Sequence, residues 1–415
     1  MKELFLIEDS VDHKISYYHL LLFFMSLPFD RFYSLIILLS FMVHTLIHFK
    51  KSDLKKLKNP DILILQLVYL LTMIGTIYTN NHLKAFQDWD RHLAILLFPI
   101  IMAVSSLDLN KYKKKLIEGL AISCVLTILY LYFDAISIIK YDHLPLSDLI
   151  SESFINYNFS SPIQIHPTYL SIFVAFSLIY FLTEFFKATS KKERIIHAIA
   201  IIILLAGLIQ LCSRSVFIAT ILIVNIAVPF SFYRGNKRII LLIYTVLLSL
   251  GALIIISQIQ SLRSRYFTDF KKDLIQSPVI EITDPRIARW DAALSIIKQA
   301  PISGYGTGSE IDVLGNEFFA RKLYHSYLHQ LNAHNQYLSF ILKFGITGLI
   351  VYLSTLFYGF RIALRRKDLL FFSFMILITI VSFSENILDV NKGIIFYSSF
   401  FSLFVFSKNK AGSRE

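Results

Sequence analysis

Long apolar runs, separated by short polar connections, recur along the chain from residue 16 to residue 407. Most of them approach the length of about 20 residues that an α-helix needs to cross roughly 30 Å of hydrocarbon. The runs are continuous rather than alternating, which favours helices over strands. The pattern predicts an all-α, polytopic transmembrane helical bundle of about twelve spans, near residues 16–28, 33–49, 61–78, 92–106, 116–138, 167–186, 195–212, 215–233, 239–259, 335–358, 369–384 and 391–407.

Lysine and arginine are concentrated in every second connection between these spans. With the N-terminus in the cytoplasm, the five cytoplasmic connections each hold three to five basic residues, within 50–58, 111–115, 187–194, 234–238 and 361–367. The short outer connections hold only scattered ones. Cytoplasmic loops of membrane proteins carry an excess of basic residues, and an odd error in the number of spans would destroy the regularity. The charges therefore predict a multi-pass protein with both termini in the cytoplasm.

Composition agrees with a membrane protein. Of the 415 residues, 55% are hydrophobic and 17% are charged, against about 25% charged in soluble domains. The net charge of +12 would suggest nucleic acid for a soluble chain, but here the basic residues belong to the topology signal. Cys124 and Cys212 lie in apolar segments and have no metal-binding or redox spacing. We expect a single integral-membrane domain over residues 1–415, with one large, partly helical outer loop at 260–333 between spans nine and ten.

A candidate helix in this loop carries two arginines. Pro285 can occupy its first position and Asp284 can cap it. Arg286, Arg289 and Trp290 then share one helical face. One guanidinium group can bind two phosphate oxygens at once and always keeps its charge, so this face suits a phosphate ligand. The alternative is a surface helix whose arginines meet nearby acids or lipid head groups.

Two further residues stand where a polar loop meets an apolar span. Arg214, flanked by Ser213 and Ser215, joins two spans with almost no loop. Such an arginine is either an anion site or an anchor at the membrane interface. His334 opens the tenth span, with Asn335 beside it as a helix cap. Histidine titrates near neutrality and can take a proton from a hydroxyl, so His334 is the best candidate for a general base. An interfacial histidine bound to a head group is the alternative.

Other polar residues fall on the same outer side. Arg91, His166 and Glu385 are possible supporting residues. The Asp88-Trp-Asp90 motif resembles metal-binding acids of some membrane glycosyltransferases, although Arg91 can simply pair with these acids. Lys343, inside the tenth span, is expected to face a polar cavity or an acid such as Glu385. The glycine-rich segment 301–309 lacks the strand and the lysine of a nucleotide-binding P-loop, so we interpret it as an irregular turn.

An outward-facing site with arginines and a histidine predicts an anionic, lipid-borne substrate. No nucleotide is expected on this side, so the donor must carry its own leaving group, and a lipid pyrophosphate fits. Guanidiniums would stabilise the charge on the departing pyrophosphate, and a base would activate an acceptor hydroxyl.

Taken in order, these motifs resemble the O-antigen ligase and O-antigen polymerase family of bacterial integral-membrane glycosyltransferases. The resemblance covers residues 160 to 405 and rests on the following segments: His166-Pro-Thr-Tyr169, Ser213-Arg214, Arg286-Ile-Ala-Arg-Trp290 running into Pro301-Ile-Ser-Gly-Tyr-Gly306, His334-Asn-Gln-Tyr-Leu338 with Phe344-Gly-Ile-Thr-Gly348, and Ser384-Glu-Asn386. It implies a bundle like those of the GT-C glycosyltransferases.

The resemblance also implies an activity. A glycan would move, without metal or other cofactor and with inversion, from undecaprenyl pyrophosphate to an acceptor hydroxyl on the periplasmic face of the bacterial inner membrane. In the ligases the acceptor is the lipid A–core oligosaccharide, so the protein would serve lipopolysaccharide biosynthesis. Arg214 and Arg286 would bind the pyrophosphate, with Arg289 a lesser candidate on the same helix. His334 would activate the acceptor. No nucleic acid partner is expected.

Other functions remain open. A polymerase of O-antigen or exopolysaccharide repeat units shares the donor chemistry and differs in the acceptor, and the sequence does not separate the two. A protein O-oligosaccharyltransferase of the same superfamily is a third possibility. A secondary transporter also fits twelve spans, but transporters usually show internal symmetry and polar sites near the midplane. The asymmetric loop 260–333 and the polar residues at the outer edge favour the transferase.

Overall fold

The computed structural model describes residues 2–29, 31–274 and 284–407, which are mostly helical and contain no strand. Each predicted apolar segment coincides with a helix. These are α2 (Val11–Ser26), α3 (Arg31–Ile47), α4 (Pro60–Gly75), α5 (His82–Val104), α6 (Leu109–Tyr141), α8 (Pro167–Lys187), α9 (Lys191–Gln210), α10 (Arg214–Leu222) continued by a π-helical turn into α11 (Val228–Phe232), α12 (Asn236–Gln258), α18 (Gln336–Arg366), α19 (Leu369–Val381) and α20 (Asn391–Phe406). The shorter helices are α1 (Lys2–Phe5), α7 (Tyr157–Ser160), α13 (Gln260–Arg263), α14 (Asp269–Leu274), α15 (Arg286–Ile297), α16 (Glu310–Ala320) and α17 (Tyr324–Leu328), with 3₁₀ turns at Lys51–Lys58, Leu146–Ile150, Glu152–Phe154 and Ser161–Ile163.

Six helices of the described chain are long and apolar enough to cross a membrane: α6, α8, α9, the α10–α11 pair, α12 and α18. A seventh is added if α3 and the helix Lys51–Lys58, which are bent by 118°, form one broken span. Helices α4, α19 and α20 are apolar but shorter. The protein is therefore an all-α integral membrane protein. Its predicted total of twelve spans is not confirmed by helix length and stays a prediction.

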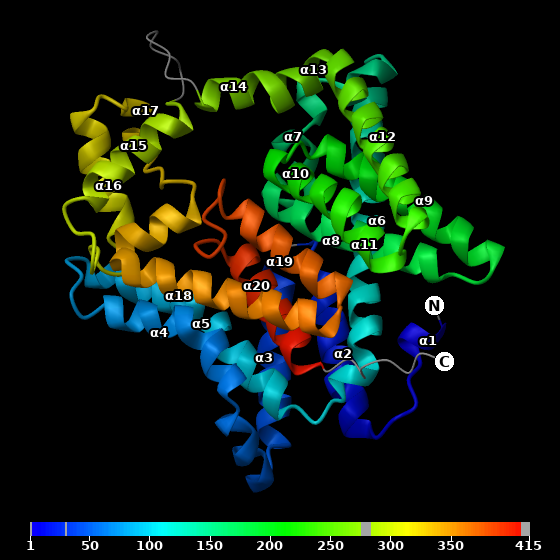
Figure 1. Ribbon diagram of the computed structural model, residues 1–415, viewed down its shortest axis with the longest axis horizontal. Coiled ribbons are helices and arrows are strands. Elements are labelled where there is room, and N and C mark those ends of the chain that lie inside the picture. Colours follow the sequence, from blue (N-terminus) through cyan, green and yellow to red (C-terminus); the bar gives the residue numbers. More distant parts are fainter. Residues whose placement is uncertain (1, 30, 275–283, 408–415) are drawn as a thin grey trace.

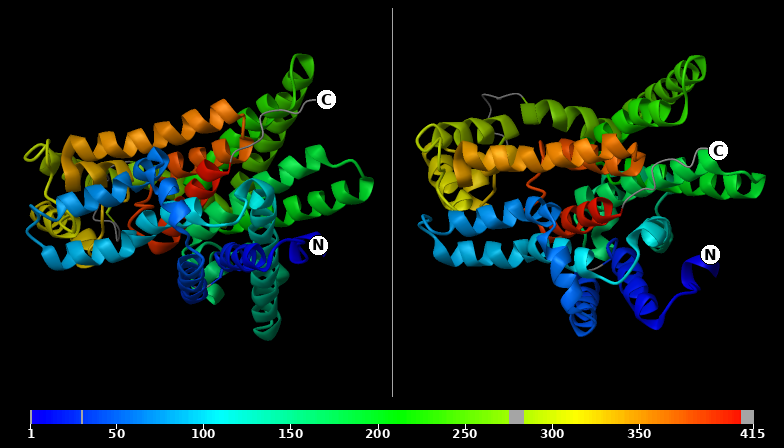
Figure 2. Two further views of the ribbon diagram at one scale, coloured as in Figure 1. Left: turned by 90° about the horizontal axis from the view of Figure 1, so that it is seen from below. Right: turned by 60° about the horizontal axis from the view of Figure 1, so that its bottom comes forward.

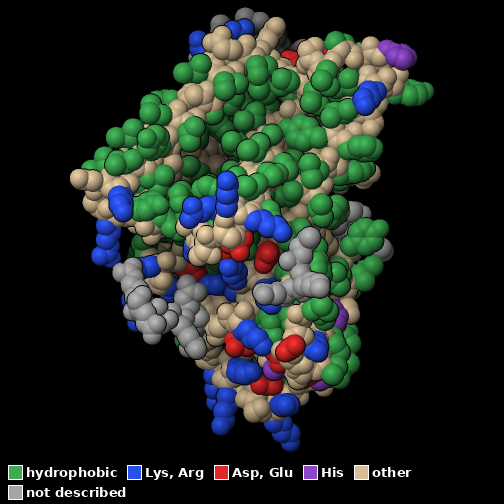
Figure 3. All heavy atoms as spheres, turned by 90° about the vertical axis from the view of Figure 1, so that its right-hand side faces the viewer, with side chains coloured by type: hydrophobic (Ala, Val, Ile, Leu, Met, Phe, Trp, Pro, Cys, Tyr) green, Lys and Arg blue, Asp and Glu red, His purple; other side chains and the backbone are tan. Residues whose placement is uncertain are grey.

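Some helices leave most of their apolar surface uncovered. Only 11% of the apolar window of α12 is buried, and 28% of that of α9. Figure 3 shows a broad hydrophobic surface on the side of the molecule that carries these two helices. Soluble proteins rarely expose an apolar surface of this extent, whereas lipid tails cover it without cost. By contrast, α8 lies in the protein core, because 78% of its window is buried.

The core is rich in stacked aromatic rings. Phe176 of α8 lies edge-on to Phe396 and Phe400 of α20, and Phe371 of α19 stacks on Phe404 at a centroid separation of 4.8 Å. Offset and edge-on ring pairs of this kind add to the stabilisation that burial alone provides. They hold α8, α19 and α20 together as the body against which the outer segments pack.

Helix α18 is broken at Gly345, whose φ of +65° and ψ of −162° are not helical. The break leaves the carbonyls of Leu342 and Lys343 without their helical partners. The glycine-rich turn supplies substitutes, because the backbone N–H of Tyr305 donates to Leu342 (3.0 Å) and that of Gly306 donates to Lys343 (2.8 Å). This turn therefore binds backbone carbonyls rather than a phosphate, in agreement with its interpretation as an irregular turn.

The loop between α12 and α18 is partly helical, as predicted. Helices α15, α16 and α17 lie together at one end of the molecule, beside the beginning of α18 (Figures 1 and 2). Their small core includes Ala293, Ile296 and Phe318, which pack with Leu342 of α18. The predicted cap of α15 was wrong, since Pro285 takes the cap position and the Asp284 carboxylate accepts the backbone N–H of Ser326 (2.7 Å).

Candidate functional site

A cavity of about 460 Å³ brings together side chains from six separate segments. Its walls are the segment before α8, the junction of α9 and α10, helix α14, the start of α15, the residue before α18 and the end of α19. It is lined by Asn156, Tyr157, His166, Thr168, Cys212, Ser213, Arg214, Ser215, Ile218, Arg265, Phe270, Asp273, Arg286, Trp290, His334, Ile380, Phe383, Ser384 and Glu385. Arg214, Arg286 and His334, which lie far apart in the sequence, thus share one cavity.

One carboxylate bridges the two arginines. Nη2 of Arg214 donates to Oδ2 of Asp273 at 2.6 Å, and Nε of Arg286 lies 3.5 Å from the same oxygen. The guanidinium of Arg214 also stands 5.7 Å from the centre of the Phe270 ring. Within the described chain, the buried Nη1 of Arg214 has no hydrogen-bond acceptor. Two guanidiniums that converge on one anionic oxygen, with a donor nitrogen unused, form a receptor for a group with several anionic oxygens.

A second carboxylate connects the histidine to the arginines. Nδ1 of His334 lies 3.3 Å from Oε2 of Glu385, whose Oε1 lies 3.7 Å from Nη2 of Arg286. Burial would raise the pKa of Glu385, but its bond to His334 and the charge of Arg286 lower it below the usual value. The ionised carboxylate accepts the Nδ1–H of His334, which leaves Nε2 as the nitrogen that can take a proton. This pairing is the one used to orient a catalytic imidazole.

The start of α15 is fixed to neighbouring backbone at two points. Nη1 of Arg286 donates to the carbonyl oxygen of Ser384 (2.9 Å), next to Glu385. Nε1 of Trp290 donates to the carbonyl oxygen of Ala333 (3.0 Å), next to His334. Because these bonds go to main-chain atoms, they place Arg286 relative to both partners of the histidine–glutamate pair.

Three residues that line the cavity have left-handed backbone conformations: Asn156 (φ +55°), Cys212 (φ +51°) and His334 (φ +46°). L-residues avoid this region, although asparagine and histidine tolerate it better than most. The backbone of His334 is stabilised there by a bond from its N–H to Oδ1 of Asn332 (2.9 Å). Strained conformations gather at functional sites, where the surrounding structure holds a side chain in a required direction.

Not every predicted residue reaches the cavity wall. The side chain of Arg289 is turned away from it into the packing of α15 and is only 6% exposed. Burial and the nearby Arg286 lower its pKa to about 10, so it stays charged at neutral pH. Its buried Nε has no acceptor within the described residues. Asn335 is the cap of α18, as predicted, because Oδ1 accepts the backbone N–H groups of Tyr337 and Leu338.

Of the other predicted residues, His166 lines the cavity and Arg91 does not. His166 lines the cavity with its ring 4.6 Å from that of Tyr157, and burial lowers its pKa. Arg91 lies on α5, does not line the cavity and pairs with Asp88 at 3.1 Å. That pair matches the simpler interpretation of the Asp88-Trp-Asp90 motif, in which Arg91 meets one of its acids.

Lys343 has partners other than the acid expected. The ammonium lies 2.8 Å from Oδ1 of Asp389 and 3.4 Å from Oε2 of Glu310, rather than beside Glu385. Asn386 donates to both carboxylates, and the backbone N–H of Asn335 donates to Oδ1 of Asn386 (2.8 Å). This buried polar network connects α16, the first half of α18 and the turn that carries Glu385, immediately behind the histidine.

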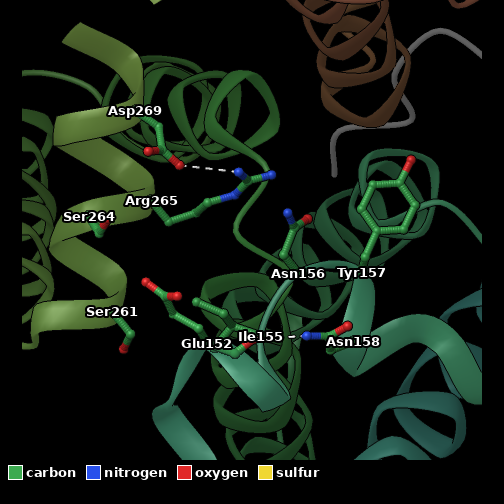
Figure 4. A pocket seen from close by; sticks show the side chains of 9 residues that line it. All are labelled: Glu152, Ile155, Asn156, Tyr157, Asn158, Ser261, Ser264, Arg265 and Asp269. Atoms are coloured by element: carbon green, nitrogen blue, oxygen red, sulfur yellow. Dashed lines mark hydrogen bonds and ion pairs between the residues drawn. The ribbon is translucent and has the colours of Figure 1, made fainter. Parts of the chain in front are cut away.

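A smaller cavity of about 320 Å³ adjoins the first and shares Asn156, Tyr157 and Arg265 with it. Figure 4 shows its polar lining, which comes from the segment 152–158 on one side and from 261–269 on the other. The Glu152 carboxylate points into this space, while Arg265 pairs with Asp269 at 3.2 Å. Amides, hydroxyls, a carboxylate and an aromatic ring are groups that can bind a saccharide.

Sequence reasoning missed Asp273, Arg265 and Tyr157. Asp273 and Arg265 counted only among the charges of the large loop, and no local pattern distinguishes them from its other charged residues. The motif at 166–169 pointed close to Tyr157 but not to it. In the cavity both acids, Asp273 and Glu385, are engaged by arginines. The donor set is therefore cationic, which favours an anionic ligand over a metal ion.

In a comparison with protein families, residues 199–353 match a family model described as O-antigen ligase. The matched region begins in α9 and ends in α18, so it includes Arg214, Arg286 and His334. It does not include Arg91, His166 or Glu385. No curated protein matches the chain.

Proposed function

Because residues 199–353 match a family model described as O-antigen ligase, we propose that this protein is a ligase-type glycosyltransferase. It would transfer a glycan from undecaprenyl pyrophosphate to a hydroxyl of the lipid A–core oligosaccharide. The observation that carries the proposal is the meeting of Arg214, Arg286 and His334, from three separate segments of the matched region, in one cavity.

The two arginines would bind the pyrophosphate, which is the leaving group of the donor. The site already binds one carboxylate, Asp273, between two guanidiniums, and Arg214 keeps a buried nitrogen without an acceptor in the described chain. A pyrophosphate has enough anionic oxygens to occupy both guanidiniums at once. Guanidiniums held in place before the reaction stabilise the charge that develops on the departing pyrophosphate.

The histidine accounts for the acceptor. Nε2 of His334 takes the proton of the acceptor hydroxyl while its oxygen forms a bond to the anomeric carbon of the donor sugar. The bond between that carbon and the phosphate oxygen breaks, and the electron pair leaves with the lipid pyrophosphate. Glu385 stabilises the imidazolium that results. The acceptor oxygen attacks opposite to the leaving group, so the anomeric configuration inverts.

The neighbouring cavity of Figure 4 provides room for sugar residues beside the arginines. We place the donor glycan there, with Tyr157 and Arg265 at the junction. The reaction would take place on the periplasmic face of the inner membrane, because the arginine-bearing segments lie on the outer side of the topology predicted from the basic residues.

The test is complementation of a bacterial strain from which the gene has been deleted. We expect Arg286→Ala and His334→Ala to abolish transfer while the protein still inserts. The matched controls are Arg91→Ala, which removes an arginine outside the cavity, and His329→Ala, which removes an exposed histidine; both should complement fully. Near-normal surface polysaccharide with either site variant would refute the mechanism.

Lipopolysaccharide gels of the deletion strain identify the acceptor. A ligase deletion removes all long-chain polysaccharide and leaves lipid-linked polymer to accumulate. A polymerase deletion instead leaves the core with a single repeat unit, and that result would replace the ligase by the repeat-unit polymerase, with the donor chemistry unchanged.

A further inference from the structure

Two histidines and an aspartate converge at the contact of α2 and α3, away from the cavity. Asp12 lies in the first turn of α2, His44 near the end of α3, and His48 one turn later. One ligand atom from each residue can be chosen so that the three lie within 4.8 Å of one another. None of these residues lines the cavity, so their arrangement is independent of the proposed transfer.

Backbone geometry puts the histidines on one face. The N–H of His48 donates to the carbonyl oxygen of His44 (3.2 Å), which continues the helical pattern past Ile47. Residues four apart in a helix lie one above the other. The two imidazole rings accordingly stand 4.3 Å apart between centroids. His44 is buried, whereas His48 and Asp12 are partly accessible.

The hydrogen bonds of His48 determine which nitrogen is available. Its Nδ1 lies 2.9 Å from the carbonyl oxygen of His44, so Nδ1 carries the proton and donates it. Nε2 faces Oδ1 of Asp12 at 2.8 Å. An imidazole nitrogen and a carboxylate oxygen at this distance share a cation, which is either a proton that makes His48 an imidazolium or a metal ion. A histidine whose Nδ1–H is held by a carbonyl is also the arrangement found in metal-ligating histidines, where it fixes the ring and its tautomer.

We propose that Asp12, His44 and His48 form a binding site for a divalent transition-metal ion of the zinc type. Two imidazoles and one carboxylate are a common protein donor set for such ions, and three protein ligands leave a position for water. The site connects α2 to the end of α3, next to the sharp bend that leads into the helix Lys51–Lys58.

The test uses the full-length protein, purified in detergent without a histidine tag, with Zn²⁺ followed by calorimetry and Co²⁺ by visible absorption. We expect one ion per chain. His48→Ala, at an accessible position, and Asp12→Asn should each weaken Zn²⁺ binding by at least about tenfold. The matched control is His13→Ala, since His13 on the same helix pairs with Asp9 at 2.8 Å without a third ligand.

Full binding in the control together with loss in both site variants establishes the site. The proposal is overturned if the wild-type protein binds no ion, if both site variants bind as tightly as wild type, or if His13→Ala weakens binding equally. In those cases a proton, rather than a metal ion, joins His48 to Asp12. Gel filtration of each variant checks that the fold is retained. If His48→Ala does not fold, Asp12→Asn serves as the second variant.

Discussion

The Asp273 carboxylate lies 2.6 Å from Nη2 of Arg214 and belongs to a different segment of the chain, helix α14. It reaches Arg286 as well, at 3.5 Å. In the proposed reaction, the position of Asp273 between the arginines is the one where a phosphate oxygen of the donor would bind. The carboxylate would then compete with the donor.

We expect Asp273→Asn to lower the KM for the lipid-linked donor by about fivefold, the equivalent of the ~1 kcal/mol typical of a partly exposed ion pair. The value of kcat should change little, because Asp273 is displaced before the reaction. Steady-state kinetics with purified protein measure both constants. A higher KM would instead mean that Asp273 holds the arginines in place, and the competition model would fail.

The pair formed by His334 and Glu385 is expected to act as a unit. Glu385→Gln keeps the shape but removes the charge that stabilises the imidazolium, so kcat should fall by about 100-fold, as for loss of general-base assistance. The donor KM should change much less. Residues that act together show non-additive losses. The double variant Glu385→Gln with His334→Ala should therefore be no slower than His334→Ala alone. If the fall in kcat of the double variant were instead the product of the two single falls, the residues would act independently.

Lys343 neutralises the buried carboxylate of Glu310 and the partly buried one of Asp389, so its removal should cost stability. Lys343→Met leaves Glu310 and Asp389 without their cation, and breaking a buried ion pair in this way costs about 3–5 kcal/mol. Thermal unfolding in detergent should show a large fall in Tm. The change Glu310→Gln, added to Lys343→Met, should recover part of it. A Tm close to that of wild type in the single variant would contradict the importance of this network.

The same network predicts that the pH dependence of stability reverses its direction in the variant Lys343→Met. Burial would raise the pKa of Asp389, but Lys343 lowers it below its ordinary value of 3.8. A carboxylate with a lowered pKa in the folded state stabilises the fold at pH values above 3.8, and this contribution is lost as pH falls through the lower folded-state value. Lys343→Met removes the largest cause that lowers this pKa and leaves burial opposed only by His92 and the bond from Asn386, so the pKa rises. Stability of that variant should then increase as pH falls from 7 to 5, which Tm measurements across this range would test.

Gly345 is expected to be irreplaceable for two reasons. Its φ of +65° is unfavourable for other residues, and a Cβ there would lie 2.0 Å from the carbonyl oxygen of Ile302. Gly345→Ala should destabilise the protein by at least about 2 kcal/mol. The matched control is Gly251→Ala in α12, where a Cβ meets no atom within 4 Å. That change should be neutral or slightly stabilising, and equal Tm values for the two variants would refute the argument.

The sequence predicted the helices well because apolar runs of this length have few alternatives in lipid. Arg214 and His334 were singled out because polar residues at the ends of apolar segments are conspicuous, and Arg286 because it shares one face of a predicted loop helix with Trp290. Arg289 was placed with Arg286, yet three helical residues correspond to a rotation of about 300°, so the two side chains diverge by roughly 60°. That difference is enough to turn Arg289 into the packing of α15.

What could not be predicted depends on partners distant in the sequence. Asp273 resembles any other loop acid until α14 is placed against α10. Lys343 meets Asp389 rather than Glu385 because the turn after α19 reverses between these two acids. The break at Gly345 is stable only because the backbone of 301–306 replaces the helical hydrogen bonds. A periodicity analysis of the span alone predicts an unbroken helix.

That replacement has a mechanical consequence. Backbone bonds connect the turn after α15 to α18, and Trp290 is bonded to the residue before His334. The segments that carry Arg286 and His334 are thus joined as one stiff unit, and main-chain geometry sets the spacing between these two residues. Arg214, at the start of α10, contacts this unit through Asp273. When a bulky lipid-linked glycan enters, the separation should therefore widen between Arg214 and Arg286, while the distance from Arg286 to His334 stays constant.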